Sequence, residues 1–290
     1  MTRDSEMLAT CVLISCYQNQ SGLLRTARSL TRDTSSFDVV IIDDGSDPPL
    51  EVPEGACGHH QFFLHRIHKN VGLSHALNAG LAIVCARGYR YIARLDSGDL
   101  IAPGRIAKQV EYLEAHPRCG VVGSYIAFVS PEDCSTVLFW HTAAHTPARL
   151  RRALHLRNVL IHSGVMFRTE ALNEVGHYLA RGSCSEDYEI FLRISTKYEL
   201  GMIPELLTLV EHGLSGISVT RRRVQQRERL RLQLRYFDPR LWESWIGVLR
   251  TIAALVSPAE LVWALKHWTS RNQETLARRT GDAARTQSGA

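Results

Sequence analysis

Apolar runs that end in acidic and glycine residues alternate with helix-like segments along the first 130 residues, and this alternation constrains the fold more than any other feature. Residues 8–17 and 37–43 are rich in aliphatic and β-branched side chains, as buried strands are. Residues 18–33 and 71–88 instead repeat apolar side chains at helical spacing. Repeated strand–helix units predict an α/β fold with a mostly parallel central sheet flanked by helices, in which ligands bind at the carboxyl ends of the strands.

Bulk properties are those of a globular protein of cytoplasmic type. A length of 290 residues suffices for one large domain with an appendage. The composition, 45% hydrophobic and 22% charged, is ordinary for a globular protein. No apolar stretch reaches the roughly 18 residues of a transmembrane helix, and the N-terminus lacks the pattern of a signal peptide. The seven cysteines contain no CxxC pair, which predicts buried, reduced thiols and no zinc site.

Charge is distributed unevenly along the chain. From residue 220 onward there are 14 Arg and Lys against 6 Asp and Glu, whereas the whole chain carries a net charge of only +5. The body is therefore mildly acidic and the C-terminal part strongly basic. We expect a main domain over residues 1–220, a basic amphipathic helical extension over 221–275 and a disordered tail over 276–290.

The segment RLDSGD, residues 94–99, follows a predicted strand and places two carboxylates three residues apart. Three interpretations are open for Asp96 and Asp99: they bind a metal ion, they cap the following helix, or they lie in a solvated turn. Asp43 and Asp44 end another predicted strand, so we expect all four acids at the same rim of the sheet.

Six segments occur in the order and spacing found in the family 2 glycosyltransferases, which the chain resembles over about residues 8–220. They read VLISCYQNQSGLLRTARSL, VVIIDDGSD, HKNVGLSHALNAGLA, YIARLDSGDLIAPGRI, HSGVMFRTEALNEVGHY and SEDYEIFLRI. The resemblance implies a GT-A fold, with the nucleotide sugar bound by about residues 8–125 and the acceptor by about 126–220. It also implies inverting transfer of a sugar from a UDP- or dTDP-linked donor to an acceptor hydroxyl, with Mg²⁺ or Mn²⁺ as cofactor.

The resemblance further implies which residues bind the donor. They are Tyr17, Asp43, Asp44, Lys69, Gly72, Arg94 and Asp96. The carboxylates of Asp43 and Asp44 would accept hydrogen bonds from the nucleoside, with Asp44 the better candidate for the base. In the competing interpretation, DDGSD is a turn capped by Asp43 or Ser46, and Lys69 and Gly72 belong to an ordinary loop.

The implied metal ligands are Asp99, Asp96 and His212. The family usually has Asp-x-Asp at this turn, and this chain has Gly98 where the second acid is expected. A hard cation such as Mg²⁺ completes its shell with water and substrate phosphate, so two carboxylates would suffice. The alternative for Asp99 is to cap the following helix, and the alternative for His212 is a solvent-facing side chain.

An inverting transfer needs a carboxylate that accepts the proton of the attacking hydroxyl. The resemblance gives this role to Asp187, with Glu186 beside it in SEDYEIFLRI. Acids at a helix N-terminus are also electrostatically favoured without any catalytic role, which is the competing interpretation. His162 and Tyr178 are expected on the acceptor side of the site, where ordinary core structure is the alternative.

The basic extension includes four tryptophans. They are Trp242, Trp245, Trp263 and Trp268. Basic residues with tryptophan fit a helix on an anionic membrane surface, and packing of the same helices on the main domain is equally open. No nucleic-acid recognition motif accompanies the arginines, so nucleic acid is not an expected partner.

Taken with these observations, the resemblance to family 2 implies a hexosyl- or rhamnosyltransferase that builds a bacterial surface glycan. The acceptor would be a lipid-linked or lipid A-linked glycan of lipopolysaccharide, O-antigen or exopolysaccharide. The enzyme would be cytoplasmic, or peripheral on the inner face of the membrane through residues 221–270. Two other functions are open. A sugar nucleotidyltransferase normally has a glycine-rich basic loop after the first strand, which SCYQNQSG lacks. A sugar-nucleotide-binding protein without turnover is favoured by Gly98 and disfavoured by the intact Glu186–Asp187 pair.

Overall fold

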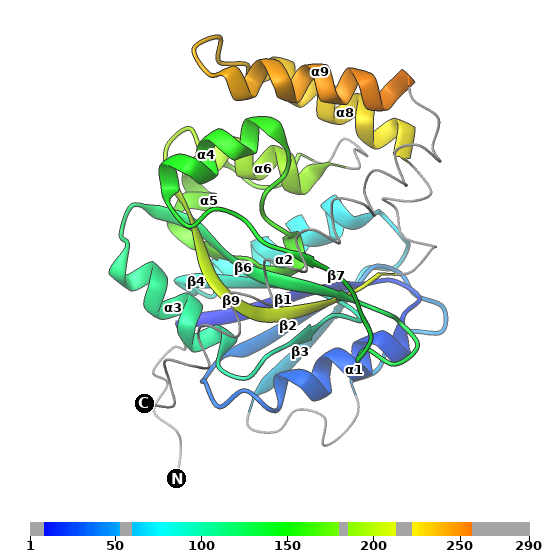
Figure 1. Ribbon diagram of the computed structural model, residues 1–290. Helices are drawn as coiled ribbons and strands as arrows, with labels where there is room; N and C mark the ends of the chain where they lie inside the picture. Colours follow the sequence, from blue (N-terminus) through cyan, green and yellow to red (C-terminus); the bar gives the residue numbers. More distant parts are fainter. Residues whose placement is uncertain (1–8, 53–59, 180–184, 213–221, 257–290) are drawn as a thin grey trace.

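The computed structural model describes residues 9–52, 60–179, 185–212 and 222–256 of the chain. A nine-stranded sheet forms the centre of the molecule, helices pack on both of its faces, and two C-terminal helices lie together at one end (Figure 1). The strands are β1 (Thr10–Cys16), β2 (Asp38–Asp43), β3 (Gln61–Arg66), β4 (Tyr91–Asp96), β5 (Leu100–Ile101), β6 (Cys119–Val129), β7 (Val137–His141), β8 (Met166–Arg168) and β9 (Glu199–Glu211). The α-helices are α1 (Gln20–Leu30), α2 (Leu73–Ala86), α3 (Arg105–Ala115), α4 (Pro147–Leu156), α5 (Thr169–Val175), α6 (Glu186–Ile194), α8 (Arg222–Arg235) and α9 (Trp242–Val256).

The sheet joins a parallel half to a mixed half. Its strand order is β3-β2-β1-β4-β8-β6-β9-β5, and β7 pairs with β6 outside this path. Strands β3, β2, β1 and β4 are parallel, as the strand–helix alternation predicts. Strand β8 is antiparallel to both β4 and β6, β5 is antiparallel to β9, and β7 is antiparallel to β6. The α/β prediction is confirmed, and the parallel pairs are confined to the first four strands and to β6 with β9.

The two faces of β1 show why the sheet is covered on both sides. Val12 and Ile14 belong to one apolar cluster, together with side chains of α1 and α3. Cys11 and Leu13 belong to the other cluster, together with side chains of α2, α4 and α6. Because successive strand residues point to opposite faces, a continuous apolar run fills both layers.

Several of these strands coincide with apolar runs of the sequence. The run CGVVGSYIAFV is strand β6, and HQFFLHRI contains β3. Ser21 is a residue type that suits the N-cap of α1, but the cap is Asn19, whose side chain accepts the hydrogen bond from the Gly22 amide at 3.0 Å. Asn is as good an N-cap as Ser, so the pattern alone could not choose between them.

The described part of the extension, residues 222–256, forms the helices α8 and α9, which pack on each other and, through α9, on α4. No helix in the described part of the chain is long and apolar enough to cross a membrane. The five cysteines in it are free thiols, three of them buried, as predicted. Trp263, Trp268 and the tail predicted over 276–290 lie outside the described residues.

Candidate active site

The carboxyl ends of β2 and β4 form the rim where the sequence places the donor site. Both strands lie parallel to β1 and on either side of it, with Cys16 opposite Asp43 and Ser15 opposite Asp96. Asp43 and Asp96 are the last residues of their strands. The predicted donor carboxylates therefore meet at one edge of the sheet.

Asp43 and Asp44 are buried, and backbone amides donate hydrogen bonds to both. The Asp43 carboxylate accepts from Ser46 at 2.8 Å and from Leu50 at 3.2 Å, so it holds the turn that follows β2. The Asp44 carboxylate accepts from the amides of Val71 at 2.8 Å and Gly72 at 3.0 Å. Asp44 thus ties the turn after β2 to the loop that begins α2. The turn interpretation and the donor-site interpretation of DDGSD are therefore compatible, because the hydrogen bonds that cap the turn also fix the positions of the predicted donor residues.

The remaining donor candidates of this rim have different exposures. Tyr17 follows β1 directly and is 50% exposed. Lys69 is exposed in the loop between β3 and α2, and Gly72 is the N-cap of α2. Lys69 and Gly72 belong to the loop that Asp44 holds, and Tyr17 and Lys69 both expose their side chains to solvent.

Arg94 and Asp96 form an ion pair at the end of β4. Arg94 is buried, and its guanidinium donates to the carbonyl of Leu13 at 3.1 Å as well as to the Asp96 carboxylate. The Asp96 side chain is 40% exposed, and its backbone amide donates to Ser163 Oγ at 2.9 Å. Asp96 therefore presents a carboxylate to solvent at the end of its strand, and its ion pair with the buried Arg94 fixes the position of this carboxylate.

Asp99 does not cap the following helix, so that interpretation is wrong. Helix α3 begins after Gly104, whose amide donates to Asp33 at 3.0 Å. Asp99 is buried instead, and its carboxylate accepts from the Glu211 amide at 2.9 Å, which fastens the end of β9 to the turn. Burial raises the pKa of Asp99 well above its ordinary value, and the negative charges of Asp96 and Glu211 act in the same direction.

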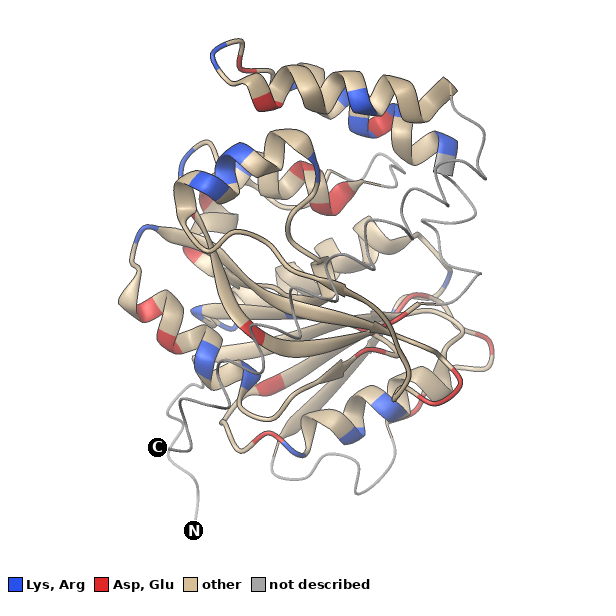
Figure 2. Ribbon diagram, viewed as in Figure 1, with Lys and Arg blue, Asp and Glu red and all other residues tan. Residues whose placement is uncertain are grey.

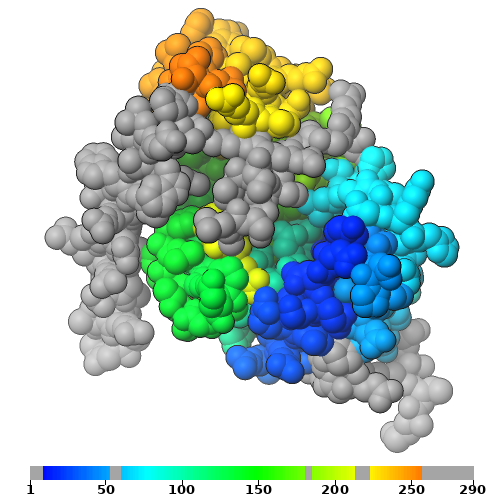
Figure 3. All heavy atoms as spheres, turned by 90° about the vertical axis from the view of Figure 1, so that its right-hand side faces the viewer, coloured from blue at the N-terminus to red at the C-terminus, as the bar shows by residue number. Residues whose placement is uncertain are grey.

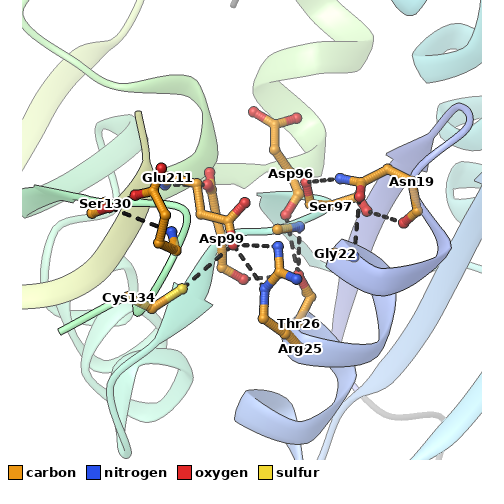
Figure 4. Close-up of polar contacts among 12 residues, drawn as sticks. Asn19, Gly22, Arg25, Thr26, Asp96, Ser97, Asp99, Ser130, Cys134 and Glu211 are labelled. Carbon is orange, nitrogen blue, oxygen red and sulfur yellow. Dashed lines mark hydrogen bonds and ion pairs between the residues drawn. The ribbon is translucent and has the colours of Figure 1, made fainter. Parts of the chain in front are cut away.

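Gly98 is flanked by a carboxylate that the sequence did not reveal. A Cβ atom at Gly98 would lie 2.6 Å from Oε2 of Glu211, and the φ of +110° also favours glycine. Glu211 accepts hydrogen bonds from Arg25 Nε at 2.8 Å and Nη2 at 2.6 Å. Figure 4 shows Asp96, Asp99 and Glu211 around this turn, with the Asp96 side chain extending away from the other two. A side chain of β9 thus fills the space next to the position where the family usually has an acid.

The structure does not assemble the predicted ligands Asp96, Asp99 and His212 into one metal site. The amide of His212 donates to Val129 at 2.9 Å, and its ring packs edge-on against Phe139 at a centroid distance of 5.1 Å. In the described stretches of the chain, no three His, Cys, Asp or Glu side chains gather in a group that suits a metal ion. The exposed carboxylate of Asp96 is the oxygen donor best placed for one.

Glu186 and Asp187 lie in the first turn of α6, where the sequence predicts the base. The Asp187 carboxylate accepts from the side chain of Asn158 at 2.8 Å and from the amide of Tyr188 at 2.7 Å. Burial raises the pKa of Asp187 to about 6, and burial with the charge of Asp187 raises the pKa of Glu186 to about 7. A carboxylate with a pKa this close to neutral is suited to general base catalysis.

His162 and Tyr178 lie buried between the rim and the base. His162 Nε2 and the Tyr178 hydroxyl are 2.7 Å apart. Burial, reinforced by the charge of Arg94, lowers the pKa of His162 to about 3, so this imidazole is neutral. The charges of Asp96, Glu186 and Asp187 all act on the Tyr178 hydroxyl. The pair is therefore within reach of the charges of both the predicted donor residues and the predicted catalytic residues.

Sequence reasoning missed two further neighbours of Asp187. Asn158 lies just before the segment HSGVMFRTEALNEVGHY and carries no sequence signal of its own. Arg229, on α8, is half-buried and lies close enough to lower the pKa of Asp187. One of eight arginines between 221 and 240 cannot be singled out by pattern, because only tertiary packing brings it to the site.

Comparisons with known proteins agree with this geometry. The model of glycosyl transferase family 2 matches residues 11–176. The amylovoran biosynthesis glycosyltransferase AmsE of Erwinia amylovora is 28% identical over 219 residues, which cover 72% of this chain and 79% of AmsE. The structure of S. aureus TarS 1-349 in complex with UDP-GlcNAc is similar with a TM-score of 0.61 and 13% identity, over 84% of this chain and 72% of TarS 1-349. The mannosyltransferase PcManGT from Pyrobaculum calidifontis, in complex with GDP-Man and Mn²⁺, has a TM-score of 0.58 and 15% identity, over 95% of this chain and 75% of PcManGT.

The structural neighbours show the GT-A fold, in agreement with the parallel half of the sheet. The matched region contains β1 to β4 and α5, and the base candidates follow it on α6. Since the family model covers more than half of the chain, the protein belongs to glycosyl transferase family 2 and is a glycosyltransferase.

Proposed function

We propose that the protein is an inverting glycosyltransferase in which Asp187 is the general base. The observation that carries this proposal is the raised pKa of Asp187, about 6, at the start of α6. In the reaction, the acceptor hydroxyl gives its proton to Asp187 while its oxygen forms a bond to the anomeric carbon. The bond between that carbon and the diphosphate oxygen breaks, and the nucleoside diphosphate leaves with the electron pair. Glu186 lies beside the base, and its buried Oε2 has no partner among the described residues, so we assign it to an acceptor hydroxyl.

The donor would bind along the rim of β1, β2 and β4. Asp43 and Asp44 hold the two loops that would enclose the nucleoside, and Tyr17 and Lys69 offer exposed side chains next to them. Arg94 would act by fixing the Asp96 carboxylate, because its own guanidinium is buried. A UDP- or dTDP-linked hexose or rhamnose is the proposed donor, and TarS, which binds UDP-GlcNAc, has the same fold.

A divalent cation, Mg²⁺ or Mn²⁺, would neutralise the charge of the leaving diphosphate when bound. The exposed carboxylate of Asp96 suits such an ion, because carboxylate oxygens are the ligands that hard cations prefer and water and substrate phosphate supply the rest. We propose that Asp96 holds it, with Glu211 standing in the space next to Gly98. Asp99 would support both by fixing β9 to the turn.

The acceptor would be a lipid-linked glycan at a membrane surface, as in the biosynthesis of an exopolysaccharide or lipopolysaccharide. Helix α9 exposes a row of large apolar side chains at helical spacing. They are Trp242, Trp245, Ile246, Leu249, Ile252 and Val256. Next to this row, α8 carries most of the basic charge of the extension. An apolar helix face beside basic residues is typical of an interfacial helix.

The first test is the replacement Asp187→Asn, which keeps the shape of the side chain and removes the base. We expect turnover of the cognate nucleotide sugar to fall by about 10²- to 10⁴-fold. Binding of the donor, measured by calorimetry, should stay within about twofold. The matched control is Glu170→Gln, another acid in the first turn of a helix, which is exposed on α5. Equal turnover in the wild type and in Asp187→Asn would contradict the proposal. Donor binding without turnover in the wild type, on any acceptor extract, would favour a sugar-nucleotide-binding protein.

A further inference from the structure

The helices α4, α8 and α9 form one packed unit that ends next to the base. Gln233 on α8 donates to the carbonyls of His155 and Leu156 at the end of α4, at 3.3 and 3.4 Å. A Cβ atom at Gly247 on α9 would lie only 2.1 Å from the carbonyl oxygen of His155, so this close approach requires glycine. Arg152 of α4 pairs with Glu243 of α9 at 2.6 Å. The C-terminal helices are therefore fixed to the end of α4.

The end of α4 also contacts the catalytic turn of α6. The Tyr188 hydroxyl donates to the Leu154 carbonyl at 2.6 Å, and Asn158 donates to Asp187. Two consecutive elements, α4 and the segment after it, thus join the C-terminal helices to the base. Figure 1 and Figure 3 place α8 and α9 over this end of the molecule.

Three arginines of this unit act on one another, and one of them, Arg229, also acts on Asp187. Arg157 is the C-cap residue of α4, Arg229 lies on α8, and Arg250 lies on α9. Burial lowers the pKa of Arg157, and the charges of Arg250 and Arg229 lower it further. Burial also lowers the pKa of Arg229, with Arg250 acting in the same direction and Asp187 opposing it. Figure 2 shows basic positions on all three helices of this end.

These three charges lack a full set of counter-charges. Among the described residues, no carboxylate lies within ion-pair distance of Arg157, Arg229 or Arg250. Asp187 is the acid whose charge acts on Arg229, and Glu243, the acid of α9, pairs with Arg152 instead. Arg157 donates to the Thr142 carbonyl at 3.4 Å, which leaves most of its donors available. Three guanidinium groups that have no carboxylate of the described chain at ion-pair distance provide planar N–H donors for phosphate oxygens.

We propose that Arg157, Arg229 and Arg250 form a binding site for a phosphate group of the acceptor, next to Asp187. This proposal rests on the proposed function, because it assigns the phosphate to a lipid-linked glycan whose hydroxyl reaches the base. Arg250 and the exposed apolar row both lie on α9, so the lipid chain would lie along this row. The C-terminal helices would then select acceptors that carry a lipid phosphate.

The test uses the whole protein and farnesyl diphosphate as the probe, with farnesol as the uncharged counterpart. Calorimetry should detect binding of farnesyl diphosphate and much weaker binding of farnesol. Arg229→Gln and Arg250→Gln should each weaken binding of the diphosphate by about tenfold or more, since a hydrogen bond to a charged group typically contributes this much. The control is Arg227→Gln, an exposed arginine on the same helix α8, which should bind like the wild type. Arg250 is exposed on α9, so its variant tests the site even if Arg229→Gln fails to fold.

The same variants separate this proposal from the proposed function. Binding of the nucleotide sugar should be unchanged in Arg250→Gln, and it is measured without any acceptor. Equal affinity of all variants for farnesyl diphosphate would overturn the phosphate site even if the transferase activity is confirmed. A second arm uses vesicles with 30% phosphatidylglycerol. If the variants lose only vesicle binding and keep farnesyl diphosphate, the arginines bind the anionic membrane surface and the acceptor assignment is wrong.

Discussion

The donor rim and the acceptor side of the site differ in how their buried carboxylates are hydrogen-bonded. At the donor rim, Asp43 and Asp44 are buried, and backbone amides satisfy them before any ligand arrives. At the acceptor side, Glu186 keeps a buried oxygen without a partner among the described residues, and the pKa values of Glu186 and Asp187 are raised toward neutral. The backbone thus preorganises the carboxylates of the donor half. The acceptor half instead has a carboxylate oxygen open to a substrate hydroxyl, and acids that can exchange protons near neutral pH.

The comparison is tested most strongly at Asp43. Replacement by Ala would leave the buried amides of Ser46 and Leu50 without acceptors, which costs about 2–4 kcal/mol of unfolding free energy. Urea denaturation should show this loss as a lower midpoint. Asp47→Ala, at an exposed position of the same turn, is the control and should change the stability by less than about 0.5 kcal/mol. A small effect at Asp43 would mean that its hydrogen bonds do not organise the rim, and that the residue is free to serve the ligand.

A smaller effect is expected at Glu211, on the metal side of the donor rim. If Glu211 stands in for the acid missing at Gly98, Glu211→Gln should weaken Mn²⁺ binding in the presence of UDP by about tenfold, the loss of one charged contact. Electron paramagnetic resonance of free Mn²⁺ measures this without any turnover. Glu205→Gln, an exposed acid on the same strand β9, is the matched control. Unchanged Mn²⁺ affinity would mean that Glu211 does not bind the metal and has a structural role through its ion pair with Arg25.

Residues that depend on local pattern were predictable, and those that depend on register between distant strands were not. The run of β6 and the acids at the ends of β2 and β4 follow from alternation and from the rule that ligands bind at strand ends. Glu211 reaches Gly98 only because β9 lies parallel to β6 and pairs with β5, which no local pattern encodes. Arg229 reaches Asp187 only through the packing of α8.

At Asp99 the structure differs from the interpretation of this residue as a helix cap. An acid shortly before a helix fits an N-cap, yet Gly104 intervenes and Asp33 of another loop accepts the amide there. The Asp99 side chain turns inward to β9 instead. The base candidates of α6 were predicted at the right helix turn because the Glu–Asp pair and its neighbours resemble the family locally, whereas their raised pKa values come from burial that the sequence does not reveal.

The smallest predicted effect concerns Asn158, which donates to the base at 2.8 Å. A donor to a carboxylate stabilises the ionised form, so removing it should raise the pKa of Asp187 above about 6. The base works when deprotonated, so turnover in the wild type should fall as pH drops through this value. In Asn158→Ala the acidic limb of the pH profile should move to higher pH by about half a unit to one unit, equivalent to one hydrogen bond. The profile of turnover against pH measures the shift directly, with Asp187→Asn as the reference without a base. A limb that stays in place, with only a lower plateau, would mean that Asn158 orients the acceptor and leaves the proton affinity of Asp187 unchanged.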